Sequence, residues 1–209
     1  MKNVSFILLF LALSFLTVAQ SSKKDSVAES PKKDSSRIGK LFAAATYPLI
    51  KNSKWSGVLP VNDIEDKPDP AMIYKLLVEV TSWSDDSASK KEINSGLAEA
   101  GRLINLHIAA GIPKQNIQAA IIVHGAALNV FLNKEAYQKK FRTDNPNLDI
   151  LKQFSALGIK LIACGQALAF YNFDKKDMIP EIKTSLSAKV TLSTYQLKGY
   201  VLYNIKDDK

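Results

Sequence analysis

One cysteine and one histidine occupy the positions at which this sequence could carry out chemistry. Cys164 is the chain's single cysteine, and it follows the apolar stretch 159–163. The length of that stretch and its flanking glycines predict a short buried strand of a parallel sheet. Reacting groups gather at the carboxyl ends of such strands, because the loops there open between helices. A helix beginning at 167–171 would place backbone N–H groups near the thiol and favour the nucleophilic thiolate.

His124 is the second candidate, because it follows the apolar stretch 117–123, which also predicts a strand. Two strand ends in one sheet can bring their side chains together, so the imidazole could accept the proton of the thiol, as in nucleophilic catalysis. Gly165 and Gln166 would let the backbone approach a group bound at the sulfur. Gly125, next to His124, completes this predicted binding site.

Structural roles account for the same residues equally well. A lone cysteine often behaves as a small buried hydrophobe, and a histidine at a strand end can simply bond to the backbone. An unpaired cysteine in an exported protein indicates either an intermolecular bond or a reactive thiol. His107, the other histidine, lies beside Leu103 and Ile104 in a predicted helix, where a structural role is favoured.

The sequence lacks the residues needed for metal binding, nucleotide binding or serine hydrolysis. One cysteine and two separated histidines do not supply a metal site. The polar loop 81–86 after the first predicted strand contains no glycine, which argues against a nucleotide site. No G-x-S-x-G elbow is present, so a serine hydrolase is unsupported. We therefore expect neither a metal nor another cofactor.

The amino-terminal region predicts export. Residues 1–19 combine Lys2, an apolar stretch over 4–16 and small residues before Gln20, which is typical of a secretory signal peptide. Residues 20–40 are rich in Ser, Lys and Asp and predict a disordered tether. Residues 41–70 contain four prolines and predict an extended arm that packs on the domain or on a neighbouring subunit, with the rim of a binding groove as the alternative. We expect a periplasmic or secreted protein without stable membrane insertion after cleavage.

The charge balance does not point to nucleic acid. The formal net charge is +8, and half of it falls before residue 41. The remaining excess is moderate and shows no basic cluster, so solvated surface lysines explain it better than a nucleic-acid partner.

Residues 71–209 alternate predicted strands and helices, which indicates one layered α/β domain with a parallel sheet. We predict strands at 74–80, 117–123, 159–163, 182–186 and 200–205. Helices are predicted at 91–110, 126–140, 148–157, 167–173 and 187–197, with a helical turn at 175–179.

The order of these motifs resembles the DsrE/DsrF-like family. The similarity is carried by Tyr74 to Thr81, Arg102 to Asn105, His124-Gly125, Leu157 to Ile159 with Ala163 to Gln166, and Gly199-Tyr200. The resemblance implies a three-layer α/β/α domain around a five-stranded, mainly parallel sheet, assembled into homo-oligomers such as trimers or hexamers. It also implies that Cys164 matches the cysteine that accepts sulfur as a persulfide, and that His124 matches a strand-end histidine of an exported branch.

Our first functional hypothesis is therefore an exported persulfide carrier that uses Cys164 and His124, with a sulfur donor or acceptor protein as partner. A non-catalytic oligomeric binding module of the cell envelope is the alternative, and it requires a buried Cys164. A hydrolytic or redox enzyme is the third hypothesis, for which the residues supply no acid/base constellation.

Overall fold

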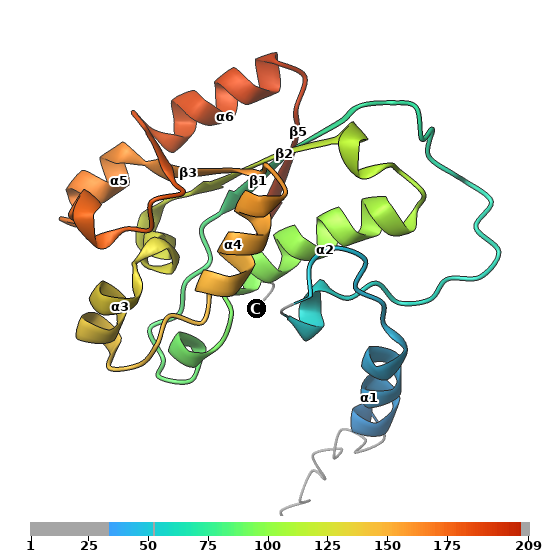
Figure 1. The fold of residues 1–209 in the computed structure, drawn as a ribbon, viewed down its shortest axis with the longest axis horizontal. Helices are drawn as coiled ribbons and strands as arrows, with labels where there is room; N and C mark the ends of the chain where they lie inside the picture. The colour runs from blue at the N-terminus through green and yellow to red at the C-terminus, as the bar shows by residue number, and fades with distance from the viewer. Residues whose placement is uncertain (1–33, 52, 206–209) are drawn as a thin grey trace, which may run out of the picture. The chain divides into compact units, whose positions relative to one another are not determined.

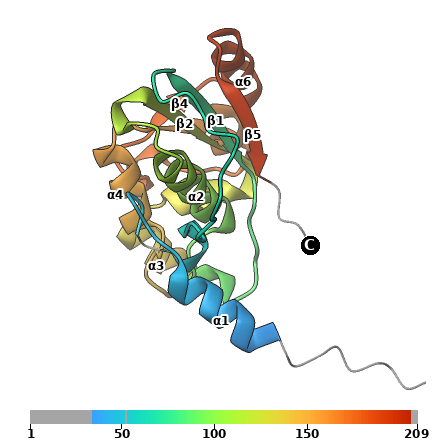
Figure 2. The same cartoon turned by 90° about the vertical axis from the view of Figure 1, so that its right-hand side faces the viewer.

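The computed structural model describes residues 34–51 and 53–205. Its central element is a five-stranded, entirely parallel sheet with strand order β4-β3-β2-β1-β5. The strands are β1 (Tyr74–Val80), β2 (Ile117–Val123), β3 (Lys160–Cys164), β4 (Lys183–Ser185) and β5 (Val201–Ile205). Figure 2 shows β5 beside β1 at one edge of the sheet. The predicted α/β class and its five strands are confirmed.

Alternation along the strands divides the core between the two faces of the sheet. In β1, Leu76, Val78 and Val80 belong to the larger core, whereas Leu77 belongs to a smaller cluster on the opposite face. Helices α2 (Ser95–Ala109) and α4 (Leu148–Ala156) cover the first face, and α6 (Ala188–Leu197) covers the second (Figure 1). The smaller cluster includes Cys164, so the cysteine side chain lies on the α6 face.

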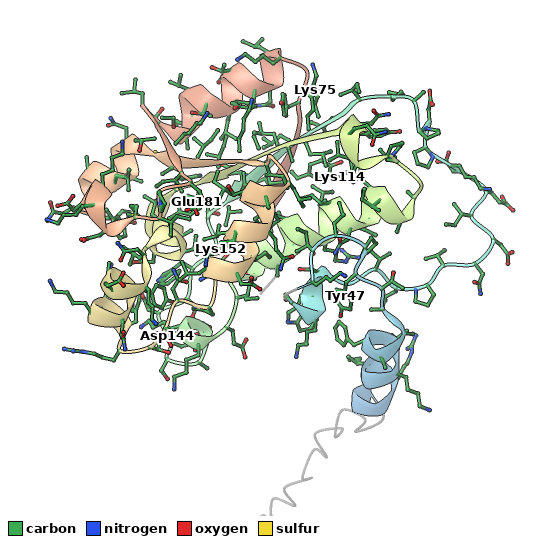
Figure 3. All side chains as sticks on the ribbon, in the orientation of Figure 1. Tyr47, Lys75, Lys114, Asp144, Lys152 and Glu181 are labelled. Carbon is green, nitrogen blue, oxygen red and sulfur yellow. The ribbon has the colours of Figure 1, made fainter. Side chains whose placement is uncertain are left out.

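Capping residues set where these helices begin. The Asn94 side chain accepts from the Leu97 amide and starts α2, and the Ser187 side chain accepts from the Val190 amide and starts α6. At the other end of α6, the ammonium of Lys75, labelled in Figure 3, donates to the Lys198 carbonyl oxygen at 3.0 Å. This bond joins the end of α6 to β1.

The single helix predicted at 126–140 is wrong. This stretch contains a 3-10 helix, Gly125–Phe131, followed by α3 (Lys134–Phe141). Asn133 separates them, because its side chain accepts from the Ala136 amide and so caps a new helix. Downstream of β3, α5 (Gly165–Phe170) is shorter than predicted, and a 3-10 turn, Lys175–Asp177, follows it.

The tether prediction is also wrong for its last residues. Helix α1 (Asp34–Ala44) begins within the stretch expected to be disordered. Its apolar side chains explain this, since Phe42 packs edge-on against Trp55 with the ring centroids 4.9 Å apart. The predicted signal peptide and the first part of the tether lie outside the described residues. Among the helices of residues 34–51 and 53–205, none is both long and apolar enough to cross a bilayer.

The proline-rich arm packs on its own domain. Asn105 of α2 is fully buried, and its side-chain oxygen accepts from the amides of Leu49 and Ile50 at 3.0 Å. Its amide nitrogen donates to the carbonyl oxygens of Ile50 and Ser56 at 2.8 Å. These four hydrogen bonds satisfy the backbone of the arm where it crosses α2. The packing role expected for the arm is thus observed at Leu49, Ile50 and Ser56.

Candidate functional site

One polar side chain from each strand lies along the carboxyl end of the sheet on its α6 face. Cys164 is paired with Ser185 of β4, and Glu79 is paired with Asn204 of β5. His124 continues β2, where Val123 pairs with Ala163, so His124 and Cys164 occupy adjacent register positions. We call this set, Ser185, Cys164, His124, Glu79 and Asn204, the polar row.

The sulfur of Cys164 lies at the amino end of α6. The Ala188 amide, in the first turn of that helix, donates a hydrogen bond to Sγ at 3.2 Å. A helix amino terminus carries partial positive charge, so an anionic sulfur is favoured there. The sequence analysis expected helix amides to reach the thiol from the segment directly after it. The amide that bonds Sγ instead belongs to α6, because the backbone turns after Ser185 and returns across the sulfur.

The thiol is closed off from solvent. Cys164 is 5% exposed and packs in a cluster with Ile122, Ile162 and Ala188. The sequence analysis expected a sulfur reachable from solvent, which this arrangement does not provide in the single chain. Ala188 packs against the sulfur, and Leu186, two residues before it, accepts from the Gln166 amide through its carbonyl oxygen at 3.1 Å.

His124 is held by a buried carboxylate. Its Nε2 lies 2.8 Å from Oε1 of Glu79, and the side-chain nitrogen of Asn204 donates to the second carboxylate oxygen, Oε2. Glu79 is only 8% exposed, whereas the imidazole side chain is 30% exposed. Burial of an ionised carboxylate is costly unless it is paired, and these two partners provide the pairing.

His124 and Cys164 are neighbours in register without a direct hydrogen bond. Adjacent strands lie about 5 Å apart, which sets the spacing of their Cα atoms. Among the hydrogen bonds of residues 34–51 and 53–205, none joins Sγ to the imidazole. The ring reaches instead toward β1 through Nε2. The two residues lie at the same edge of the sheet, as expected from the sequence, and the register also places them on the same face.

Glycine is required at positions 165 and 125 of the predicted binding site for two different structural reasons. A Cβ on Gly165 would lie 2.5 Å from the Ser185 carbonyl oxygen, so glycine permits the close approach of β4 to the start of α5. Gly125 has a positive φ of 65° and open space around it, where glycine avoids strain. Gln166 is exposed, and its backbone amide rather than its side chain makes the contact with residues 186–188.

Sequence reasoning missed Glu79, Asn204 and Ala188. Glu79 offered a signal, because it is a single charged residue within the otherwise apolar end of a predicted strand. Asn204 and Ala188 offered none, since their roles depend on strand order and on the return of the chain over Cys164. Among the described residues, no group of three or more His, Cys, Asp or Glu side chains could hold a metal ion.

The largest electrostatic effects of burial lie on α3, away from the polar row. Desolvation raises the pKa of Tyr137 to about 12. Desolvation also lowers the pKa of Lys140, whose ammonium donates to the side-chain oxygen of Asn129 at 2.8 Å and lies over the ring of Phe173. Both groups tie α3 to neighbouring segments, so we assign them a structural role.

Comparison of the domain with solved structures finds weak similarity. Two solved structures resemble it weakly: a protein of unknown function, MTH1491 from Methanobacterium thermoautotrophicum, at 14% identity and a TM-score of 0.44, and the ychN protein from E. coli, at 15% identity and a TM-score of 0.46. Each alignment covers 63% of this chain and 99% of the other. No curated protein matches.

The family model is the decisive comparison. The model of the DsrE/DsrF-like family matches residues 79–203, which is more than half of the chain. The match runs from Glu79 almost to Asn204 and so includes His124 and Cys164. This chain therefore belongs to the DsrE/DsrF-like family.

Proposed function

We propose that this protein is an exported sulfur carrier in which Cys164 accepts sulfane sulfur as a persulfide. Family membership suggests a function of the sulfur-relay type at the level of the family. The observation that supports the proposal for this chain is the 3.2 Å hydrogen bond from the Ala188 amide to Sγ at the amino end of α6. This environment favours the anionic sulfur that the chemistry requires.

The transfer step needs no external oxidant. The Cys164 thiolate attacks the outer sulfur of a donor persulfide, and its electron pair forms the new S–S bond. The S–S bond of the donor breaks, and its electron pair leaves with the donor sulfur, which becomes a thiolate. The acceptor is then Cys164–S–SH, or its anion, and the reverse reaction delivers the sulfur onward. A persulfide is a reversible cap of this kind.

His124 is the proton acceptor in this proposal. The step begins with the loss of the thiol proton, and an imidazole one strand away can hold that proton while the sulfur attacks. The 30% exposure of the ring then allows exchange of the proton with solvent. In this proposal Gly125, Gly165 and Gln166 keep the binding role that their position in the sequence beside His124 and Cys164 predicts.

The burial of Cys164 adds a requirement to the proposal. A donor reaches Sγ once residues 186–188 move away from it. These residues join β4, an edge strand of three residues, to α6, and Leu186 is 72% exposed. Such an opening would break the hydrogen bond from the Ala188 amide to Sγ and the one from the Gln166 amide to the Leu186 carbonyl oxygen.

Export and assembly are part of the same proposal. The residues that support export are the basic and apolar pattern of 1–19. A homo-oligomer such as a trimer or hexamer would cover exposed apolar side chains of α6 and β5, including Leu197 at 89% and Val201 at 58% exposure. A donor or acceptor protein would be the transient partner.

A second candidate function is favoured by the burial of Cys164. In an oligomeric binding module of the cell envelope, the cysteine would be a packing residue among Ile122, Ile162 and Ala188. The polar row would then serve to fix the strand ends, with no transfer of sulfur.

Alkylation of the native thiol separates the two functions. The carrier predicts that iodoacetamide modifies Cys164 in the folded protein, at a rate that rises as the thiolate forms. The binding module predicts modification only in denaturant. Since Cys164 is the single cysteine, a Cys164→Ser variant provides the background in both conditions. Absence of native modification would exclude the carrier.

A further inference from the structure

We infer that Glu79, held by Asn204, is a positioning residue that keeps the Nε2 proton of His124 in place and leaves Nδ1 as the nitrogen that exchanges a proton with Cys164. This inference deepens the proposed function and rests on it for the role of the sulfur. The placement of the imidazole proton, however, can be measured without any sulfur chemistry.

The hydrogen bond between Glu79 and His124 has one possible direction when the carboxylate is ionised. An ionised carboxylate can only accept hydrogen bonds. The 2.8 Å contact between Oε1 of Glu79 and Nε2 of His124 therefore places the proton on Nε2. The side-chain nitrogen of Asn204 donates to the other carboxylate oxygen, Oε2. Both oxygens of the buried carboxylate thus face a donor.

The proton on Nε2 determines the role of the other ring nitrogen, Nδ1. When Nε2 carries the proton of a neutral imidazole, Nδ1 is an acceptor. Among the hydrogen bonds of residues 34–51 and 53–205, none engages Nδ1 of His124. Along the polar row, Cys164 lies on one side of His124 and Glu79 on the other, on β3 and β1. The carboxylate thus holds one nitrogen and leaves the second available for the sulfur.

The position of Glu79 suits orientation of the His124 ring better than stabilisation of the fold. Its side chain stands on the α6 face of β1, where Leu77 is apolar and fully buried. An apolar residue at position 79 would extend that cluster at no cost of charge burial. A carboxylate is favoured here if the ring needs a fixed tautomer, because the bond to one ring nitrogen determines the state of the other.

The tautomer can be observed directly, because the chain has only two histidines. We propose long-range ¹H–¹⁵N spectroscopy of the imidazole rings in the full chain, with His107→Gln to assign the signals. The expected result is an Nε2-protonated neutral ring for His124 in the wild type. In Glu79→Gln, the side-chain amide can donate to Nε2, so the proton is expected to move to Nδ1. An unchanged tautomer in Glu79→Gln would overturn the inference.

A kinetic measurement adds a second readout. We expect Glu79→Gln to slow the alkylation of native Cys164 about as much as His124→Asn does, by roughly 100-fold or more, the scale of general-base effects. The double variant should be no slower than His124→Asn alone, because both changes remove one function. Additive effects in the double variant would contradict the inference.

Asn204→Ala is the second variant, in case Glu79→Gln does not fold. Asn204 is exposed, and its replacement removes one donor from Glu79 while keeping the Glu79–His124 contact. We expect a mixture of tautomers and a smaller loss of alkylation rate. An unchanged tautomer and rate would count against the role of Asn204. If the tautomer shifts as expected but Cys164 takes up no sulfur, the proposed function fails and the positioning role of Glu79 stands.

Discussion

The backbone amide of Ala188 donates a hydrogen bond to Sγ of Cys164 across 3.2 Å, which joins the end of β3 to the first turn of α6. The two residues are distant in sequence, and β4 lies between them. The contact places the sulfur where helix amides are free to donate, because the first N–H groups of a helix have no partner within it. Because of this contact, the start of α6 both favours an anionic sulfur and packs against that sulfur.

Replacement of Ala188 by proline tests the contribution of this amide. Proline lacks the N–H group, yet it is well tolerated at the first position of a helix, and Ser187 before it is already extended. We expect the alkylation rate of native Cys164 at neutral pH to fall by about tenfold, because a hydrogen bond to a charged group contributes roughly 1.5–3 kcal/mol. Ala188→Gly keeps the amide and is the control. Equal rates in the two variants would show that the amide has no such effect.

Replacement of Gly165 by alanine tests the close contact between α5 and β4. The new Cβ would lie 2.5 Å from the Ser185 carbonyl oxygen, so the edge strand must shift. We expect a loss of about 1–3 kcal/mol in the free energy of unfolding, the usual cost of overpacking. Urea denaturation measures it. Gly39→Ala, in α1 with nothing within 4 Å of the new atom, should not be destabilised. A Gly165→Ala variant as stable as the wild type would contradict the packing described here.

Replacement of Asn105 by alanine tests how the arm is attached. The change leaves the amides of Leu49 and Ile50 and two carbonyl groups without their partner. Each buried backbone group without a hydrogen-bond partner costs about 1–3 kcal/mol. We therefore expect the arm to detach from α2, so that its backbone groups bond to water. Trypsin should then cleave at Lys51 or Lys54 much faster than in the wild type. Asn116→Ala, which removes one exposed hydrogen bond to Pro70, should leave cleavage unchanged. Equal resistance of both variants to trypsin would contradict the prediction.

The buried phenol of Tyr137 predicts a pH dependence of stability. Desolvation raises its pKa in the folded protein from 10.0 to about 12, so the unfolded state loses its proton first as the pH rises. Stability is therefore fully present below pH 10 and is lost between pH 10 and about 12, by an amount on the order of 2 kcal/mol. Tyr137→Phe should show a shallower decline in unfolding free energy over this range, since lysine titration is common to both proteins. Parallel curves of unfolding free energy against pH for the two proteins would show that Tyr137 does not cause the decline.

The sequence predicted the sheet well because strand signals here are local. Residues 74–80 and 117–123 combine β-forming and apolar side chains between clear breakers, and both strands have the predicted bounds. Only the shared edge of Cys164 and His124 was predictable in this way, because the rule that parallel strands end at one edge needs no knowledge of their order. The helix predicted at 126–140 failed because the capping role of Asn133 outweighs the continuous helical pattern around it.

The contacts of the candidate site were less predictable, because they depend on strand order and on a returning loop. Glu79 meets His124 since β1 and β2 are neighbours, and it meets Asn204 since β5 lies on the far side of β1. The burial of Cys164 results in part from Ala188, which packs against it from the start of α6, and no local pattern encodes this contact. Helix α1 was missed because its stabilising partner, Trp55, is contributed by the arm.

Sulfur uptake by the folded protein tests the central claim most directly. The full chain is incubated with a sulfane-sulfur donor such as an inorganic polysulfide, and its intact mass is measured beside that of Cys164→Ser. The account predicts a gain of one sulfur atom in the wild type, reversed by a thiol reductant, and no gain in the variant. An unchanged mass in the wild type, or equal uptake by both proteins, would contradict it.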